Sequence, residues 1–231
     1  MRRLKLASVL AAASMSVSVV LAPVSNAEGA YITPGDAIIV TNGDSGGLCT
    51  LGPYMEVDGV YGAVTAGHCG DDGSTVSLRT TSGNPLPISK LHGSTDTETT
   101  DSAFIPLSAS LVEPSASILG KFPVEGAMDM PEILGVLHNP AIAPTRVCST
   151  GVTSDTRCGN ITGVSLTYNR IYARFPSDKG DSGGPVWAAG DDGVRVVGIL
   201  RGKLMSDPTL SVILPISVAI REQGGRLLSV G

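Results

Sequence analysis

Short runs of apolar and β-branched residues recur along the chain and alternate with turn-forming pairs. Such runs occupy residues 37–40 (AIIV), 62–65 (GAVT) and 195–200 (RVVGIL). Asn-Gly or Asp-Gly pairs, which are typical of tight turns, stand at residues 42–43, 58–59, 72–73 and 192–193. Strands this short, bounded this often by turns, predict an all-β sandwich or barrel.

Only one segment has the pattern of a helix. Residues 215–223 open with a proline, place Ile216 and Ile220 one helical turn apart, and are followed by two glycines. Residues 107–123 are rich in serine and proline and are the best candidate for a linker. We therefore expect one short C-terminal helix and two β domains, at residues 28–112 and 113–231.

The first 27 residues have the order of regions of a secretory signal peptide. A basic start is followed by an apolar, small-residue run, and Ser-Asn-Ala at residues 25–27 matches the pattern that precedes cleavage. A membrane anchor is the alternative, but serines interrupt the run, and a spanning helix needs about 20 apolar residues. We predict that residues 1–27 are a signal peptide and that the product is secreted.

Removal of this segment changes the formal net charge from −5 to −8, because Arg2, Arg3 and Lys5 are lost with it. An acidic chain without basic runs argues against nucleic acid or an anionic membrane as a partner. No other apolar stretch is long enough to span a bilayer. We expect an extracellular monomer that makes no membrane contact after cleavage.

The chain has four cysteines: Cys49, Cys69, Cys148 and Cys158. An even number behind a signal peptide favours disulfides. Three pairings are possible, and the local one, 49 with 69 and 148 with 158, is the simplest. A zinc site is the competing interpretation, but there is no C-x-x-C pair and only His68 adjoins a cysteine, so we expect no metal.

Two glycine-containing motifs carry the residue types of nucleophilic catalysis. Residues 65–69 (TAGHC) place His68 beside a cysteine, and residues 180–185 (GDSGGP) place Ser182 among glycines. A serine becomes a good nucleophile when a histidine accepts its proton and a third group orients the histidine. Glycines allow a tight loop in which the amides of Gly180 and Ser182 form an oxyanion hole.

The pentapeptide GDSGG also occurs at residues 43–47. It precedes His68 and lacks the proline that follows the second copy, so we expect a turn there and no second nucleophile. If Cys49 pairs with Cys69, this turn lies close to His68. We hypothesise that it then lines the leaving-group side of the cleft.

TAGHC followed by GDSGGP resembles the chymotrypsin-like serine peptidases, and most of all their bacterial branch, which contains the streptogrisins and α-lytic protease. Residues 35–38, 158–162 and 215–220 are also similar to that branch. The resemblance covers nearly all of the chain after residue 27. It implies two six-stranded antiparallel β-barrels, with a catalytic triad in the cleft between them.

The resemblance also implies that the acid of the triad lies between His68 and Ser182. Asp101, 33 residues after His68, precedes an apolar strand in the way that the family's aspartate does. The rivals are Asp96, Glu98 and Asp129. The first two stand in a polar, threonine-rich loop and the third stands beyond the expected linker, so Asp101 is the predicted acid.

Two stretches expected to bind substrate depart from the family's pattern. The residue six positions before the nucleophile sets the base of the specificity pocket in the family, and here it is the uncharged Pro176. The strand that faces the substrate backbone carries Arg201, Gly202 and Lys203 where small residues are usual. The two cations either narrow the pocket and attract acidic side chains, or are simply solvated.

A further departure concerns Asp181, the residue before the nucleophile. In bacterial relatives its counterpart is neutralised by an arginine just after the start of the Cys148–Cys158 loop. Here Ser149 and Thr150 stand near that position, which leaves Arg146 as the nearest substitute.

These observations predict a secreted serine endopeptidase that hydrolyses peptide bonds through an acyl-enzyme intermediate. Ser182 is the expected nucleophile, His68 the general base and acid, and Asp101 the group that orients His68. The expected partner is a protein or peptide substrate, and no cofactor is expected. Two alternatives remain: a catalytically silent binding or adhesion module, and an esterase that uses the same triad.

Overall fold

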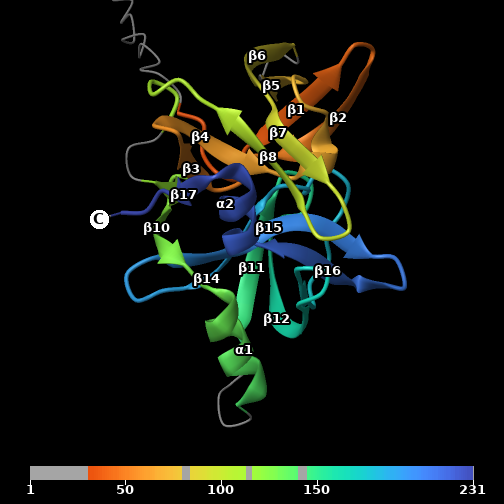
Figure 1. Ribbon diagram of the computed structural model, residues 1–231, viewed down its shortest axis with the longest axis vertical. Coiled ribbons are helices and arrows are strands. Elements are labelled where there is room, and N and C mark those ends of the chain that lie inside the picture. Colours follow the sequence, from red (N-terminus) through yellow and green to blue (C-terminus); the bar gives the residue numbers. More distant parts are fainter. Residues whose placement is uncertain (1–30, 80–83, 113–115, 140–144, 231) are drawn as a thin grey trace, which may run out of the picture.

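Antiparallel strands make up most of the molecule in the computed structural model (Figure 1). The structure describes residues 31–79, 84–112, 116–139 and 145–230. The predicted signal peptide lies outside these ranges. No helix in the described ranges is long and apolar enough to cross a membrane.

The C-terminal half forms a closed six-stranded antiparallel barrel. Its strand order is β14-β11-β12-β13-β16-β15, and pairing of β14 with β15 closes it. The strands are β11 (Arg146–Gly151), β12 (Asp155–Ser165), β13 (Arg170–Ala173), β14 (Pro185–Ala189), β15 (Val194–Leu204) and β16 (Asp207–Pro215). Fully buried aliphatic side chains such as Val147, Ile171 and Val197 fill its core. Two further strands, β9 (Ser117–Ile118) and β10 (Phe122–Ala127), extend the sheet beside β15.

The N-terminal half consists of two antiparallel sheets around a second core. One sheet contains β1 (Ala37–Asn42), β2 (Ser45–Thr50), β5 (Thr75–Arg79) and β6 (Pro85–Lys90). The other contains β3 (Tyr54–Val57), β4 (Val60–Thr65), β7 (His92–Asp96), β8 (Asp101–Pro106) and β17 (Gly225–Leu227). Alternate residues such as Ile38 and Val40 on β1 point into this core. The predicted all-β class is confirmed, and the paired sheets are compatible with the predicted second barrel.

The last described strand returns to the N-terminal half. The predicted C-terminal helix is present as α2 (Ile216–Gln223), which buries Ile216, Val218 and Ala219. After α2, strand β17 pairs with β3 of the N-terminal half. In Figure 1, α2 lies between the strands of the two halves. The C-terminal segment therefore links the two halves: α2 follows the last strand of the C-terminal barrel, and β17 joins a sheet of the N-terminal half.

The expectation of a single helix was wrong, because a second helix, α1 (Met130–His138), follows β10. Its start has recognisable signals: the Asp129 side chain accepts a hydrogen bond from the Glu132 amide at 3.0 Å, and Pro131 stands in the first turn. The helix has only nine residues and buries only Ile133. A helix that buries so little has a weak apolar pattern, which is why the sequence did not reveal it.

Two disulfides are present, Cys49–Cys69 and Cys148–Cys158, in the local pairing that the sequence favoured. The first joins the end of β2 to a short 3-10 turn, η1 (Gly67–Cys69), which carries His68. The second joins residues that face each other on β11 and β12. Only the first disulfide therefore constrains the position of His68.

Candidate active site

Three side chains that are distant in sequence meet where the two halves face each other. His68 lies on η1, directly after β4; Asp101 begins β8; and Ser182 lies in the loop between β13 and β14. The Nε2 atom of His68 is 2.9 Å from the Oγ of Ser182, and its Nδ1 is 2.9 Å from Oδ2 of Asp101. These are the contacts required of a nucleophile, a base and an orienting acid.

The carboxylate of Asp101 holds the His68 loop as well as the His68 ring. Asp101 is fully buried, and its Oδ1 accepts a hydrogen bond from the His68 backbone amide at 3.0 Å. The hydrogen bond between the Asp101 carboxylate and Nδ1 raises the pKa of His68 above its ordinary value, while partial burial and the charge of Arg201 oppose this rise. Nε2 then faces Ser182 and can accept its proton.

None of the three rival acids makes such a contact in the described structure. The carboxylate of Asp96 pairs with Arg201 at 2.9 Å. The contact described for Glu98 is through its carbonyl oxygen, which accepts a hydrogen bond from Arg170 at 2.7 Å. Asp129 caps α1. Asp101 is thus the one of the four carboxylates that reaches His68.

The loop around Ser182 needs glycine at two positions. Gly180 has φ +104° and Gly183 has φ +85°, a region that other residues rarely adopt. A Cβ atom on Gly180 would collide with Thr153 Oγ1, and one on Gly183 would collide with Thr65 Oγ1. The glycines that identified the motif in the sequence are therefore required by both backbone angle and space.

The amides of Gly180 and Ser182 make no hydrogen bond to any described residue. Their carbonyl oxygens are held from the other half of the molecule by Thr50, at the end of β2. The Thr50 amide donates to the Ser182 oxygen, and the Thr50 hydroxyl donates to the Gly180 oxygen, both at 2.8 Å. The Gly180–Asp181 and Ser182–Gly183 peptide groups are thereby fixed. The amides of Gly180 and Ser182 stay available for a developing oxyanion.

The sequence did not single out Thr50 as part of the site. It is fully buried, and besides the two bonds to the Ser182 loop, its hydroxyl accepts a hydrogen bond from the Val152 amide at 3.0 Å. Its backbone oxygen accepts a hydrogen bond from the Thr65 hydroxyl. The only sequence signal was its position beside Cys49, because its partners Val152, Gly180 and Ser182 lie more than 100 residues away and no local pattern shows them.

Asp181 is stabilised differently from the expected ion pair with Arg146. Its Oδ1 accepts hydrogen bonds from the amides of Thr153 and Ser154 at 2.9 Å, and its Oδ2 accepts one from the Asp178 amide at 2.8 Å. The expectation that Arg146 neutralises the charge of Asp181 was wrong, because Arg146 begins β11 and is exposed to solvent. Three backbone donors compensate the buried carboxylate without a cation.

Arg201 faces Asp101. Between Leu200 and Gly202 the pairing of β15 with β16 shifts register, and such a bulge re-aims a side chain. The Arg201 guanidinium lies 3.4 Å from Asp101 Oδ2 and 2.9 Å from Asp96 Oδ1, and 26% of the side chain is exposed. It is therefore not the simply solvated residue of one sequence interpretation, and its charge is already paired with two carboxylates.

The other residues expected to bind substrate have different positions. Lys203 pairs with Asp178 at 3.0 Å, on the surface. Arg201, Gly202 and Lys203 line a cavity of about 240 Å³ beside His68, which we name the β15 cavity. Pro176 is exposed and does not line this cavity, because the chain between β13 and the Ser182 loop carries it to the surface.

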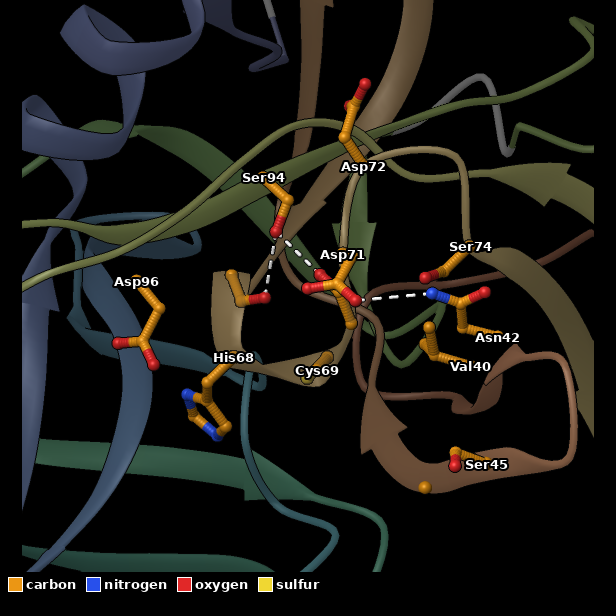
Figure 2. A pocket seen from close by; sticks show the side chains of 14 residues that line it. Val40, Asn42, Ser45, His68, Cys69, Asp71, Asp72, Ser74, Ser94 and Asp96 are labelled. Atoms are coloured by element: carbon orange, nitrogen blue, oxygen red, sulfur yellow. Dashed lines mark hydrogen bonds between the residues drawn. The ribbon is translucent and has the colours of Figure 1, made fainter.

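A second and larger cavity, of about 600 Å³, lies beside His68 (Figure 2). We name it the Asp71 cavity. It is lined by residues 45–47 at the start of β2, by the loop from Gly67 to Asp72, and by Val40, Asn42, Ser74, Ser94 and Asp96. The expected turn at the first GDSGG segment is confined to residues 43–44. The hypothesis that the first GDSGG segment lies near His68 agrees with this lining. The described residues hold no cluster of three or more His, Cys, Asp or Glu side chains suited to a metal ion.

Solved structures with the same arrangement of strands are bacterial serine proteases. Thermobifida fusca protease A superposes with a TM-score of 0.63 at 21% identity, over 87% of this chain and all of the other. A glutamic-acid-specific serine protease gives 0.65 at 20% identity, over 85% of this chain and 100% of that one. Nocardiopsis protease gives 0.60 at 23% identity, over 87% and 100%. The molecule therefore has the fold of the bacterial chymotrypsin-like serine proteases.

Two Mycobacterium tuberculosis proteins are related to this chain in sequence. Uncharacterized protein Rv1815, of strain H37Rv, is 30% identical over 159 residues, which are 67% of each chain. Uncharacterized protein MT1863, of strain CDC 1551, is 32% identical over 171 residues, with the same shares. No family model matches the chain. The chain belongs to the family of Rv1815 and MT1863.

Proposed function

We propose that the protein is a serine endopeptidase in which Ser182, His68 and Asp101 act as a catalytic triad. The observation that carries the proposal is the 2.9 Å approach of His68 Nε2 to Ser182 Oγ, with the other ring nitrogen bound to a buried carboxylate. The fold of the bacterial serine proteases supports the same reaction class. The amides of Gly180 and Ser182 are the proposed oxyanion hole.

The proposed reaction proceeds by acyl transfer. His68 Nε2 takes the hydroxyl proton as Ser182 Oγ attacks the carbonyl carbon, and the oxygen of the tetrahedral intermediate accepts hydrogen bonds from the two amides. The protonated Nε2 then gives its proton to the departing amine, which leaves an ester on Oγ. Water attacks this ester with His68 again as the base. His68 then returns the proton to Ser182 Oγ as the bond to the acyl group breaks, and the acid product leaves. Asp101 orients the ring and stabilises its charge throughout.

The chain offers a matched control for this proposal, because Ser45 occupies the same pentapeptide as Ser182. Ser182→Ala is expected to lower kcat on casein or a peptide library about 10⁴-fold or more, whereas Ser45→Ala is expected to leave kcat nearly unchanged. Cleavage of esters without cleavage of peptides would identify an esterase. Full peptidase activity in Ser182→Ala protein would remove the proposal.

A second candidate is a secreted binding module on the protease fold. It is favoured by the pairing of Arg201 with Asp96 and Asp101 and of Lys203 with Asp178, because both cations stand on the strand expected to face substrate. Folded protein that captures peptides but never cleaves them would support this candidate over the endopeptidase.

Export is part of the proposal. Two disulfides support an oxidising compartment, since such bonds are rare in the cytosol. The expected result is protein in the culture medium that begins near Glu28, measured by intact mass and N-terminal peptide mapping. Protein confined to the cytosol with residues 1–27 attached would contradict it.

A further inference from the structure

Two cavities flank His68, and they share only His68 and Asp96 among their lining residues. The β15 cavity is lined by the strand expected to face the substrate backbone, and the Arg201 carbonyl oxygen on that strand lies 3.5 Å from Ser182 Oγ. Because His68 must give its proton to the departing amine, the leaving group passes next to the ring. The Asp71 cavity is therefore on the leaving-group side, if the proposed reaction holds.

The charge of the Asp71 cavity is negative. Asp71 and Asp72 are exposed at its lining, and neither forms an ion pair with a described cation. Asp71 accepts a hydrogen bond from the Asn42 amide group at 3.2 Å, and Asp72 accepts one from the Gly93 backbone amide at 2.7 Å. No lysine or arginine is among the lining residues. The carboxylates thus keep acceptor positions and charge available for a ligand.

Ser74 gives a second and independent indication of a ligand. It lines the same cavity, only 3% of the residue is exposed, and its hydroxyl has no hydrogen-bond partner among the described residues. Figure 2 shows this hydroxyl turned toward Asp71 and the amide of Asn42. Buried hydroxyls in folded proteins nearly always have a partner, so an unpaired one at a cavity marks a place where a ligand group can bind.

The surroundings of this position are held in a fixed arrangement. The Ser94 hydroxyl lies within hydrogen-bonding distance of the carbonyl oxygens of Gly67 and Gly70, at 2.9 and 2.6 Å. The Cys49–Cys69 disulfide links the same loop covalently to β2. Asp71 follows directly on this loop. A ligand at the Asp71 cavity therefore meets groups that are already in place, at a defined position relative to His68.

We propose that the Asp71 cavity binds the basic side chain of a lysine or arginine on the leaving-group side of the substrate. An ammonium or guanidinium supplies only donors, and Asp71 and Ser74 supply acceptors, with Asp72 adding negative charge at the rim. This inference rests on the proposed peptidase function and names its substrate class: peptides with a basic residue shortly after the cleaved bond. Specificity then arises from the leaving-group side, while the cations that line the β15 cavity are already paired with carboxylates.

The test uses binding and cleavage of the same peptides, so that the two proposals are judged separately. Peptides with Lys, Ala or Glu in the first three positions after the cleaved bond are titrated into Ser182→Ala protein. The Lys peptide is expected to bind about fivefold more tightly than the Ala peptide, and the Glu peptide more weakly than either. The Lys preference is expected to shrink as ionic strength rises.

Three variants locate the effect. Asp71→Asn keeps an acceptor for Asn42 and is expected to abolish most of the Lys preference. Ser74→Ala removes a hydroxyl without a partner, so it is expected to keep the stability of the fold and to weaken the binding of the Lys peptide. Asp58→Asn is the control, because Asp58 is an exposed carboxylate in the β3–β4 turn and does not line the cavity.

The results distinguish failure of the subsite inference from failure of the proposed peptidase function. A Lys preference lost in Asp71→Asn but kept in Asp58→Asn supports the inference, whether or not wild-type protein cleaves the peptides. Equal binding of all three peptides, or a preference unchanged in Asp71→Asn, overturns it even if cleavage is fast. Absence of cleavage by folded wild-type protein contradicts the proposed peptidase function alone.

Discussion

At the scale of the residue, the chemistry depends on the protonation of His68. As the proposed base it must be neutral, and its bond to Asp101 raises its pKa. Its neutral form is therefore reached only at a pH above the usual value of about 6.5 for histidine. The positive charge of Arg201, paired with the same carboxylate, lowers the His68 pKa and limits this rise.

This balance predicts the pH dependence of activity. In wild-type protein, kcat/KM is expected to fall as the pH drops below the raised pKa of His68. In Arg201→Gln protein the lowering charge is gone, so the His68 pKa rises and the acidic limb moves to higher pH. The control is Arg226→Gln, an exposed arginine on β17 that pairs with Glu56. An acidic limb that moves to lower pH, or moves equally in the control, would contradict the assigned role of Arg201.

At the scale of the element, the functional groups of the site are positioned by loops, by strand ends and by one β-bulge. The Ser182 loop is held by Thr50 from β2 and by three amides on the Asp181 carboxylate. A bulge in β15 directs Arg201 toward β8. The strands themselves contribute rigidity. Apart from Arg201 at its bulge, the polar groups of the site come from strand ends or connections.

The Asp181 cluster gives a prediction for the oxyanion hole. Asp181→Asn keeps the shape of the side chain but sets an amide donor against at least one backbone donor. The unfolding free energy is expected to fall by about 1–3 kcal/mol. The proposed kcat is expected to fall more than KM changes, since the loop carries the oxyanion donors. Asp178→Asn is the control, because only its backbone amide joins the cluster; equal losses in both variants would contradict this account.

Sequence patterns predicted the parts of the site that depend on local constraints. The glycines around Ser182, the cysteine beside His68 and the strand after Asp101 are all visible within a few residues. Thr50 and the Arg201–Asp101 contact were not visible, because each depends on how distant strands come together. Helix α1 was missed for a different reason: it buries little, so its apolar pattern is weak.

At the scale of the whole molecule, the site lies between two halves, and each half contains one disulfide at a different distance from the site. One disulfide fixes the His68 loop to β2, and the other lies within the C-terminal barrel. The carbonyl oxygens of the loop after β7 accept hydrogen bonds from Arg170 and Arg201 of the other half. The relative position of the halves therefore determines whether His68 meets Ser182.

The two disulfides make a matched pair for testing this dependence. Their sequence separations are 20 and 10 residues, and loss of either is expected to cost about 3 kcal/mol of stability. Replacing Cys49 and Cys69 by serine is expected to lower peptidase activity at least tenfold in protein that is still folded. Replacing Cys148 and Cys158 is expected to lower activity less, because the strand pairing of β11 with β12 still holds the loop that contacts Asp181. Activity assays and urea unfolding of both variants test whether the Cys49–Cys69 disulfide positions His68. A greater loss of activity in the variant without Cys148 and Cys158 would contradict the account.

The most direct measurement of the central claim is the site of reaction with a fluorophosphonate, mapped by peptide mass spectrometry on folded protein. The account predicts one adduct, on Ser182, and its loss in His68→Ala protein, with the fold unchanged by circular dichroism. Folded wild-type protein that carries no adduct, or carries it on Ser45, would contradict the claim that His68 activates Ser182.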